Sequence, residues 1–306
     1  MAETDRKHRS PDYGGRLGYG IFHWCLRLLG VVPAYALLAM VVPYYVVFRP
    51  DARRSVAPYL KLRFPDLTRL GMLLKTVKYF YAFGQVLIDQ AAMGVLGPER
   101  FKVDFPKAKE LHALAHKRKG LVLLTTHAGN WQTAMANMGD LQVPVHFQLR
   151  LEAHTAGRHF FDLGSNREMF RIVSPDGFLG GMVELTNAVK SGECVSVMGD
   201  RSWGGKTGPA VFLGQVAEFP IMPYHLTLHT DSELVVLLTA RTGKCAYRIE
   251  YTRITGDCNL DDMPRNHAIQ ELMHRYVACL EDYLARHPLM WFNCFDFWSP
   301  DKQDTP

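Results

Sequence analysis

The stretch Gly120-Leu-Val-Leu-Leu-Thr-Thr-His127-Ala-Gly-Asn130-Trp-Gln132 decides the fold class of this chain. It begins as an apolar, β-branched run that predicts a buried strand over Leu121–Thr126. It then breaks at a polar loop and continues with helical composition over Asn130–Met138. His127 is therefore expected at the carboxyl end of a strand, just before a helix. Ligands of open α/β sheets bind at such positions, and the first turn of a helix offers unpaired N–H groups to an anion or a developing oxyanion.

Short apolar runs alternate with helical patterns along the rest of the chain. Further strands are expected at Val145–Leu149, Phe170–Val173, Cys194–Met198, Leu234–Ala240 and Tyr247–Tyr251. Helices are expected at Arg53–Leu62, Leu67–Met93, Gly180–Lys190 and Arg265–Arg286. Strands that alternate with helices imply an α/β fold with a mostly parallel sheet flanked by helices. Asp66 lies in the break between the first two helices and is expected to be the N-cap of the second.

The composition excludes a disordered protein, because 48% of the residues are hydrophobic and 11% are aromatic. At 306 residues the chain is long enough to bury a large core. The net charge of +5 has two interpretations. The first is an ordinary solvated surface. The second is a surface that attracts anionic headgroups or an acidic carrier protein that presents a thioester. The six cysteines are scattered without a Cys-x-x-Cys pair, which is typical of reduced thiols in a cytosolic environment.

Leu28–Phe48 contains no charged residue and is long enough to cross a hydrocarbon core of about 30 Å. Pro33 and Pro43 interrupt it, which argues against a straight spanning helix. A kinked or monotopic pair of helices lying in the membrane interface is a second interpretation, and a buried core helix of a soluble protein is a third. A signal peptide is disfavoured, because the stretch is too long and no small-residue cleavage site follows it.

Basic residues flank this apolar stretch, and the larger group follows it. The group before it contains Arg6, Lys7, Arg9 and Arg16, and the group after it contains Arg49, Arg53, Arg54, Lys61 and Arg63. This bias favours a cytoplasmic location for the part of the chain that follows. We therefore expect a polar tail over residues 1–16, a membrane-anchoring helical segment over residues 17–64 and a folded domain over residues 65–306.

The motif around His127 resembles the His-x4-Asp/Glu signature of the lysophospholipid acyltransferase superfamily. The nearest branch is the late acyltransferases of lipid A biosynthesis, where His-x-Gly-Asn-Trp-Glu is a common form. The resemblance implies a lysophospholipid-acyltransferase-like fold, with residues 65–306 as the catalytic domain. It implies transfer of a fatty acyl group to a lipid or polar acceptor, with His127 deprotonating the acceptor hydroxyl or amine. Asn130 of the same motif is assigned to substrate binding.

The resemblance also implies the setting of the reaction. The acyl donor would be a thioester of acyl-carrier protein or coenzyme A, used as a substrate, with no bound cofactor. The other partners would be a lipid acceptor and a membrane, with no nucleic acid. The location would be a bacterial-type inner membrane, with the catalytic part facing the cytoplasm.

Gln132 occupies the acidic position of the motif and departs from the family pattern. An acid there holds the imidazole in its correct tautomer and stabilises the imidazolium. The Gln132 amide oxygen can accept a hydrogen bond from the ring but cannot neutralise the imidazolium. Three outcomes are open. Gln132 orients His127 well enough for a more reactive acceptor such as an amine; another carboxylate, foremost Asp200, supplies the charge; or the chain is a non-catalytic, lipid-binding relative.

Further candidate residues follow other expected strands. Arg150, after Val145–Leu149, suits a phosphate or a thioester oxygen, or else forms a surface ion pair with Glu152. Arg167 stands in a block that resembles the arginine-bearing second block of the family, or else lies in a solvated turn. Asp200 and Arg201 follow Cys194–Met198. This pair is expected to orient the acceptor or to hold a phosphate. The alternative is a structural salt bridge between the two side chains.

The C-terminal run Pro288-Leu-Met-Trp291-Phe-Asn293-Cys-Phe-Asp296-Phe-Trp298 resembles the tail of the lipid A branch. Its aromatic side chains suit a membrane interface. In that branch basic residues follow the tryptophan, whereas Asn293 and Asp296 stand here. This difference argues against an acceptor with two phosphates, such as lipid A. Upstream, Phe212-Leu-Gly214 followed by Phe219-Pro220-Ile-Met-Pro223 resembles the fourth block of the family, a proline at a helix start that lines the acyl tunnel.

One cluster has the side chains of a metal site. His154 and His159, with Glu152 and Asp162 nearby, have the ligand chemistry of zinc or iron. Their spacing matches no strong metal signature, so we predict no metal. The chain also has no P-loop, no Rossmann glycine fingerprint and no Gly-x-Ser-x-Gly elbow.

Overall fold

The computed structural model describes residues 15–136, 141–150, 169–202, 205–256, 259–260 and 262–299. The chain forms two compact units. Unit 1 comprises Met1–Pro98 and Asn293–Pro306, and unit 2 comprises Glu99–Phe292. The boundary expected at residue 65 falls between two helices of unit 1, whereas the units divide at Pro98 and again at Asn293.

Unit 1 is helical. Its helices are α1 (Gly15–Leu29), α2 (Val31–Phe48), α3 (Pro50–Arg63) and α4 (Arg69–Leu96). The uncharged stretch forms two helices because Gly30 adopts φ +85°, a conformation that only glycine enters without strain. Pro33 falls in the first turn of α2, where a missing N–H costs little, and Pro43 lies inside the helix. Within the described residues, α2 is the one helix long and apolar enough to cross a membrane, judged by length and composition.

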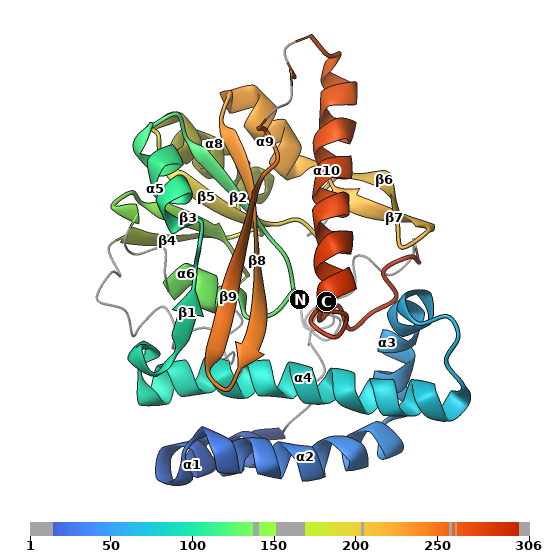
Figure 1. Ribbon diagram of the computed structural model, residues 1–306. Helices are drawn as coiled ribbons and strands as arrows, with labels where there is room; N and C mark the ends of the chain where they lie inside the picture. Colours follow the sequence, from blue (N-terminus) through green and yellow to red (C-terminus); the bar gives the residue numbers. More distant parts are fainter. Residues whose placement is uncertain are drawn as a thin grey trace, which may run out of the picture. The chain divides into compact units, whose positions relative to one another are not determined.

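One face of α2 packs against α4, and α1 and α2 run along α4 (Figure 1). The buried residues of α2 recur at the spacing of one helical face: Ala34, Tyr35, Leu38, Val42 and Val46. The Leu38 side chain of α2 packs directly on Gly84 of α4. A Cβ added to Gly84 would lie 2.6 Å from Leu38 Cδ1, so a larger residue there would displace this contact. The other face of α2 stays exposed, with Met40, Tyr44 and Phe48 each more than 60% accessible.

Polar side chains cap two helix ends in unit 1, the start of α4 and the end of α2. Thr68, not Asp66, is the N-cap of α4, and its Oγ1 accepts a hydrogen bond from Gly71 N at 3.1 Å. The predicted Asp66 cap is therefore wrong, because α4 begins at Arg69 and Asp66 lies in the preceding turn. At the end of α2, Arg53 NH1 donates to the carbonyl oxygens of Val46 (2.6 Å) and Val47 (2.7 Å). A basic side chain thus satisfies carbonyl groups that the helix leaves unpaired.

Unit 2 contains a seven-stranded sheet in the order β1-β9-β8-β2-β5-β3-β4. Its strands are β1 (Lys102–Asp104), β2 (Leu121–Thr125), β3 (Val145–Gln148), β4 (Phe170–Val173), β5 (Cys194–Met198), β8 (Glu233–Gly243) and β9 (Ala246–Arg253). Strands β2, β3, β4, β5 and β8 run parallel, and β9 is antiparallel to β8. The predicted mostly parallel sheet and its expected strands are confirmed. The additional strands are β1 and the hairpin β6 (Thr207–Phe212) and β7 (Gln215–Pro220).

Helices cover both faces of this sheet. The helices of unit 2 are α5 (Ala108–His116), α6 (Trp131–Ala136), α8 (Met182–Lys190), α9 (Met222–Thr230) and α10 (Arg265–Arg286), with 3-10 turns η2 (Pro98–Arg100) and η5 (Phe178–Gly181). Every residue of β2 is buried. Leu121 and Leu123 face α5 and α6 in one core, whereas Leu124 lies on the side of α10, since a Cβ on Gly199 would meet both Leu124 and Tyr276. Strand alternation explains this division.

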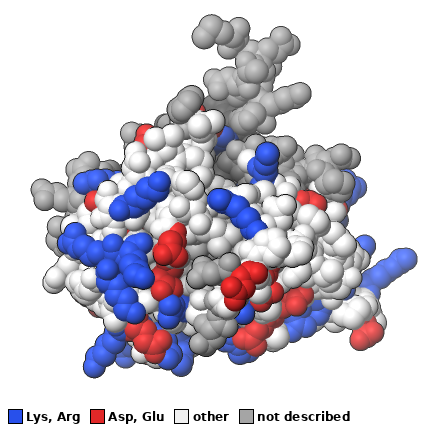
Figure 2. Space-filling model, turned by 90° about the horizontal axis from the view of Figure 1, so that it is seen from above, with Lys and Arg blue, Asp and Glu red and all other residues white. Residues whose placement is uncertain are grey.

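Charges of both signs share the surface. In the view of Figure 2, Lys and Arg side chains gather on one side of the face, with Asp and Glu side chains beside them. Surface ion pairs include Arg248 with Asp104 at 3.3 Å and Arg253 with Glu233 at 2.5 Å.

Candidate active site

The loop after β2 is held by two neighbouring segments of unit 2. Gly129 adopts φ +58°, and an added Cβ would lie 1.7 Å from the Thr239 carbonyl oxygen of β8, so only glycine fits there. On the other side, the segment around Trp291 pairs with the loop. Gly129 N donates to Met290 O and Phe292 N donates to His127 O, both at 2.7 Å, and Ala128 forms an antiparallel bridge with Trp291. The backbone of His127 is thereby fixed.

His127 and Asp200 lie side by side. His127 Nδ1 lies 2.9 Å from Asp200 Oδ1, and the His127 backbone N–H donates to Asp200 Oδ2 at 3.0 Å. The sheet register explains this pairing of residues 73 positions apart. Thr125 of β2 is opposite Met198 of β5 in the parallel ladder. Each site residue stands two positions beyond these partners, at the carboxyl ends of adjacent strands.

The Asp200 carboxylate is fully buried, and three hydrogen bonds from described residues hold it. The third comes from the Trp291 indole, whose Nε1 donates to Oδ2 at 2.9 Å. Burial alone raises the pKa of the carboxyl. Attraction to His127 and the hydrogen bonds from His127 and Trp291 outweigh burial, so the pKa lies below its usual value. The charge of the neighbouring Arg201 acts in the same direction.

This geometry assigns the ring proton. An ionised carboxylate only accepts hydrogen bonds, so the Nδ1 of a neutral His127 carries the proton and Nε2 holds the lone pair. Within the described ranges, Nε2 has no hydrogen-bond partner, and the side chain is 22% exposed. A histidine that is oriented by a buried carboxylate and open at Nε2 has the arrangement of a general base.

Gln132 lies elsewhere. It is the second residue of α6 and is 5% exposed. Among the described residues, its side chain makes no hydrogen bond to His127, whose Nδ1 is occupied by Asp200. Of the outcomes left open by the sequence, the geometry matches a carboxylate supplied by Asp200.

The other candidate residues that the structure describes follow the carboxyl ends of β2, β3 and β5. Asn130 is fully buried, and its carbonyl oxygen accepts the Thr133 N–H at 3.0 Å, so it supports the first turn of α6. Arg150 follows β3 and forms a bidentate ion pair with Asp176, with Nε 3.0 Å from Oδ2. It lies two strands from β2, or about 10 Å at the usual strand spacing. Arg201 is half-buried beside Asp200.

Several candidates suggested by the sequence fall outside the described residues. These are Arg167, Glu152, His154, His159 and Asp162. Within the described part of the chain, no group of three or more His, Cys, Asp or Glu side chains is arranged to hold a metal ion.

Trp291 is a site residue that the sequence did not reveal. Its run of aromatic residues predicted a membrane interface, but the Trp291 side chain is fully buried in unit 2. The sequence did hold one indication of this role. A tryptophan that is buried needs a hydrogen-bond acceptor for its indole N–H, and a carboxylate is such an acceptor. The predicted proline at a helix start is confirmed for Pro223, which lies in the first turn of α9, whereas Pro220 of the same block ends β7.

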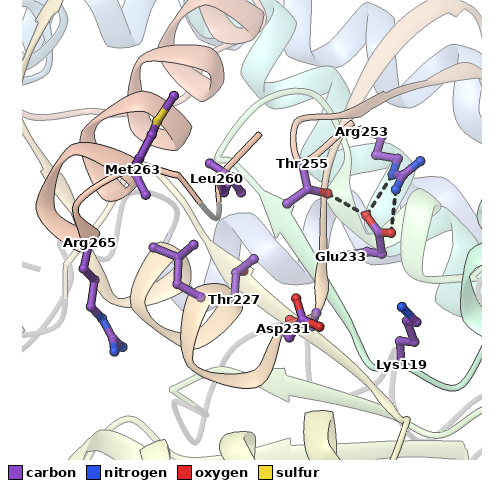
Figure 3. A pocket seen from close by; sticks show the side chains of 12 residues that line it. Lys119, Thr227, Asp231, Glu233, Arg253, Thr255, Leu260, Met263 and Arg265 are labelled. Carbon is purple, nitrogen blue, oxygen red and sulfur yellow. Dashed lines mark hydrogen bonds and ion pairs between the residues drawn. The ribbon is translucent and has the colours of Figure 1, made fainter. Parts of the chain in front are cut away.

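A pocket of about 340 Å³ lies near the start of β2 and β8, at the end of these strands opposite to His127 (Figure 3). Lys119 precedes β2, and Glu233, at the start of β8, pairs with Arg253 at the end of β9. His127 follows the other end of β2, and five residues of strand separate the two regions by about 16 Å. The pocket is therefore distinct from the His127 site.

The comparison with known families agrees with this geometry. The chain matches the family model described as bacterial lipid A biosynthesis acyltransferase over residues 1–298. It belongs to this family. A comparison with curated proteins finds no match.

Membership of the lipid A biosynthesis acyltransferase family confirms the resemblance seen in the His127 motif. The protein is accordingly an acyltransferase of the lipid A biosynthesis type. In this member, the carboxylate beside the histidine comes from Asp200, two residues after β5, and not from α6.

Proposed function

We propose that this protein transfers a fatty acyl group from a thioester of acyl-carrier protein or coenzyme A to a hydroxyl or amine of a lipid acceptor. His127 is the general base, and Asp200 orients it and stabilises its charged form. The observation that carries the proposal is the contact between His127 Nδ1 and the buried Asp200 carboxylate, which leaves Nε2 open.

The proton path follows from this arrangement. His127 Nε2 takes the proton of the acceptor group as its oxygen or nitrogen attacks the thioester carbonyl carbon. The imidazolium is stabilised by Asp200, which stays ionised. When the carbon–sulfur bond breaks, the thiolate leaves and takes the proton from His127. Acceptor proton, acyl group and thiol are balanced, and the histidine is regenerated.

The chemistry of the side chains supports a proposal for the acceptor and for the groups that bind the substrates. Asn293 and Asp296 stand where cations are expected for an acceptor with two phosphates, so we propose an acceptor with fewer phosphates. Arg150 and Arg201 are proposed to bind a phosphate or the thioester oxygen, since a guanidinium matches both. Arg167 and Asn130 keep the substrate-binding role only as hypotheses from the motif.

The test is transfer of a radiolabelled palmitoyl chain to total bacterial membrane lipid by the purified, full-length protein. Palmitoyl-acyl-carrier protein and palmitoyl-coenzyme A are supplied in parallel, and mass spectrometry identifies the product. We expect a labelled lipid that depends on the protein. Absence of labelled product with both donors would contradict the proposal.

We propose catalysis in preference to the non-catalytic alternative. It rested on Gln132 in place of an acid, and Asp200 provides a buried carboxylate at hydrogen-bonding distance from His127. We therefore do not propose a lipid-binding role without catalysis.

Replacement of Gln132 by alanine should change acyl transfer by less than about 3-fold. The reason is that its amide neither contacts His127 among the described residues nor supplies charge. Initial rates of Gln132→Ala and wild type, with thermal unfolding to correct for folded fraction, measure this. A loss as large as that of Asp200→Asn would show that Gln132 supports His127 in the reacting conformation.

We propose that α1 and α2 attach the protein to the cytoplasmic face of a bacterial-type inner membrane. One face of α2 is packed on α4, and the opposite face displays large apolar side chains. The exposed set includes Trp24, Leu28, Leu29, Met40, Tyr44 and Phe48. A helix pair with one packed face and one exposed apolar face suits the membrane interface. The basic residues after α2 support the cytoplasmic side.

The protein should pellet with membranes and resist extraction by high salt and carbonate. Burying four large apolar side chains contributes roughly 6–12 kcal/mol at about 1.5–3 kcal/mol each. Changing Trp24, Met40, Tyr44 and Phe48 to serine together should therefore release the protein into the carbonate supernatant. The control changes Val211 and Val216 to serine, since these are comparably exposed on the β6–β7 hairpin. Quantitative recovery of the wild type in the soluble fraction would refute the attachment.

A further inference from the structure

The segment that follows α10 reaches the catalytic loop through both backbone and side chain. Its backbone pairs with His127 and Gly129, and the Trp291 indole N–H reaches the carboxylate that holds the histidine. No part of the Trp291 side chain is exposed, and the hydrogen bonds of the described part of the chain join it to Asp200 rather than to His127. The Trp291 side chain can therefore act on the reaction through Asp200.

Of the three described hydrogen-bond donors, two contact one oxygen of the Asp200 carboxylate and one contacts the other. Oδ2 accepts from Trp291 Nε1 and from the His127 backbone N–H, while Oδ1 lies against His127 Nδ1. A carboxylate rotates about one bond, so fixing Oδ2 also fixes the direction of Oδ1. The indole and the His127 backbone N–H thus together determine which oxygen faces the imidazole and at what angle.

Trp291 is itself held rigidly. Its ring packs edge-on against Phe212 of β6, with centroids 5.2 Å apart, and Phe212 packs against Phe219 of β7. Its backbone is paired with Ala128. Aromatic packing of this kind leaves the ring in one orientation. The N–H is therefore aimed at Asp200 before substrate arrives, as a preorganised site requires.

We propose that Trp291 is a positioning residue of the acyltransferase site, which holds Asp200 in the orientation that fixes the tautomer of His127. The inference rests on the proposed function of the His127–Asp200 pair. Without the indole N–H, the carboxylate rotates and the imidazole samples the tautomer with the proton on Nε2. That tautomer has no lone pair to take the acceptor proton.

Trp291→Phe removes the N–H and keeps an aromatic ring. We expect kcat to fall about 10-fold to 100-fold, the range typical of residues that orient a reacting group from outside, with the KM for the thioester unchanged. The assay measures palmitoyl-coenzyme A consumption by thiol release, with total membrane lipid as acceptor. Tyr247→Phe is the matched control, because it changes a buried aromatic side chain on β9, two strands from β2.

A double-variant cycle separates positioning from general packing. If Trp291 acts through Asp200, Trp291→Phe should have little further effect in the Asp200→Asn background. Equal fold losses in both backgrounds would overturn the proposal. Replacing Trp291 with 3-benzothienylalanine, which keeps the bicyclic ring and lacks the N–H, gives the same test if the phenylalanine variant unfolds.

A spectroscopic readout tests the inference independently of turnover. The ¹⁵N spectrum of histidine-labelled protein, with the His127 signals identified by His127→Ala, reports which ring nitrogen carries the proton. We expect Nδ1–H alone in the wild type and a mixture of tautomers in Trp291→Phe. An unchanged tautomer in Trp291→Phe would overturn the positioning role. Absence of acyl transfer by a wild type with the expected tautomer would count against the proposed function alone.

Discussion

Asp200→Asn is expected to lower the rate of acyl transfer by about 10⁴-fold, the loss seen when an amide replaces the orienting carboxylate of a comparable catalytic histidine. Asp200 is fully buried and accepts hydrogen bonds from the ring and the backbone of His127. An amide cannot stabilise the imidazolium. Its N–H₂ group also donates to Nδ1, which places the ring proton on Nε2 and removes the base. Initial rates with a labelled acyl donor measure the effect.

Asp282→Asn is the matched control for this variant. It makes the same chemical change on α10, where the carboxylate is exposed and paired with Arg286 at 2.7 Å, so activity should stay within about 2-fold, as for most surface changes. Near-normal activity of Asp200→Asn would remove Asp200 from the mechanism.

Stability against pH gives a second measurement on Asp200. Because its pKa is lowered in the folded protein, its ionised form contributes stability that is present above the ordinary carboxyl pKa, about 4. That contribution is lost as the pH falls through the folded-state pKa. The wild type should therefore lose more stability than Asp200→Asn on acidification below about pH 4. Thermal unfolding across pH 3–7 compares the two.

Elements with a strong local pattern were predicted well. Phe170–Val173, Cys194–Met198 and Arg265–Arg286 have the bounds that the structure gives to β4, β5 and α10. The buried strand β5 is a nearly continuous apolar run, β4 is short and rich in apolar residues, and α10 carries the spacing of an amphipathic helix that ends before Pro288. In each case the local sequence and the packing of the element agree.

The β6–β7 hairpin was missed because its local signals conflict. Pro209 and Pro220 disfavour strands, and the resemblance to a family block directed attention to a helix start. Period-2 burial is present nonetheless, with Ala210 and Phe212 inward and Val211 outward. The turn at Leu213 and Gly214, both at positive φ, matches a two-residue hairpin turn.

The pairing of His127 with Asp200 depends on information that a linear motif does not contain. The motif placed His127 correctly after a strand but directed the search for its acid to Gln132. The acid is 73 residues away and becomes a neighbour only through the pairing of β2 with β5. Both strands were predicted, but their adjacency and register depend on the topology of the whole sheet. Trp291 was missed for the same reason.

His127→Ala should abolish acyl transfer to the same level as Asp200→Asn, a loss of about 10⁴-fold at the upper end of general-base catalysis. Since Asp200 acts through His127, the double variant should be no slower than either single variant, as for residues that work as one unit. His267→Ala is the control, because that histidine is exposed in the first turn of α10. The KM for the thioester should stay unchanged, since the base acts on the acceptor proton. Residual transfer at a tenth of the wild-type rate or more by correctly folded His127→Ala would show that another group takes that proton. A further loss in the double variant would show that Asp200 has a role independent of His127.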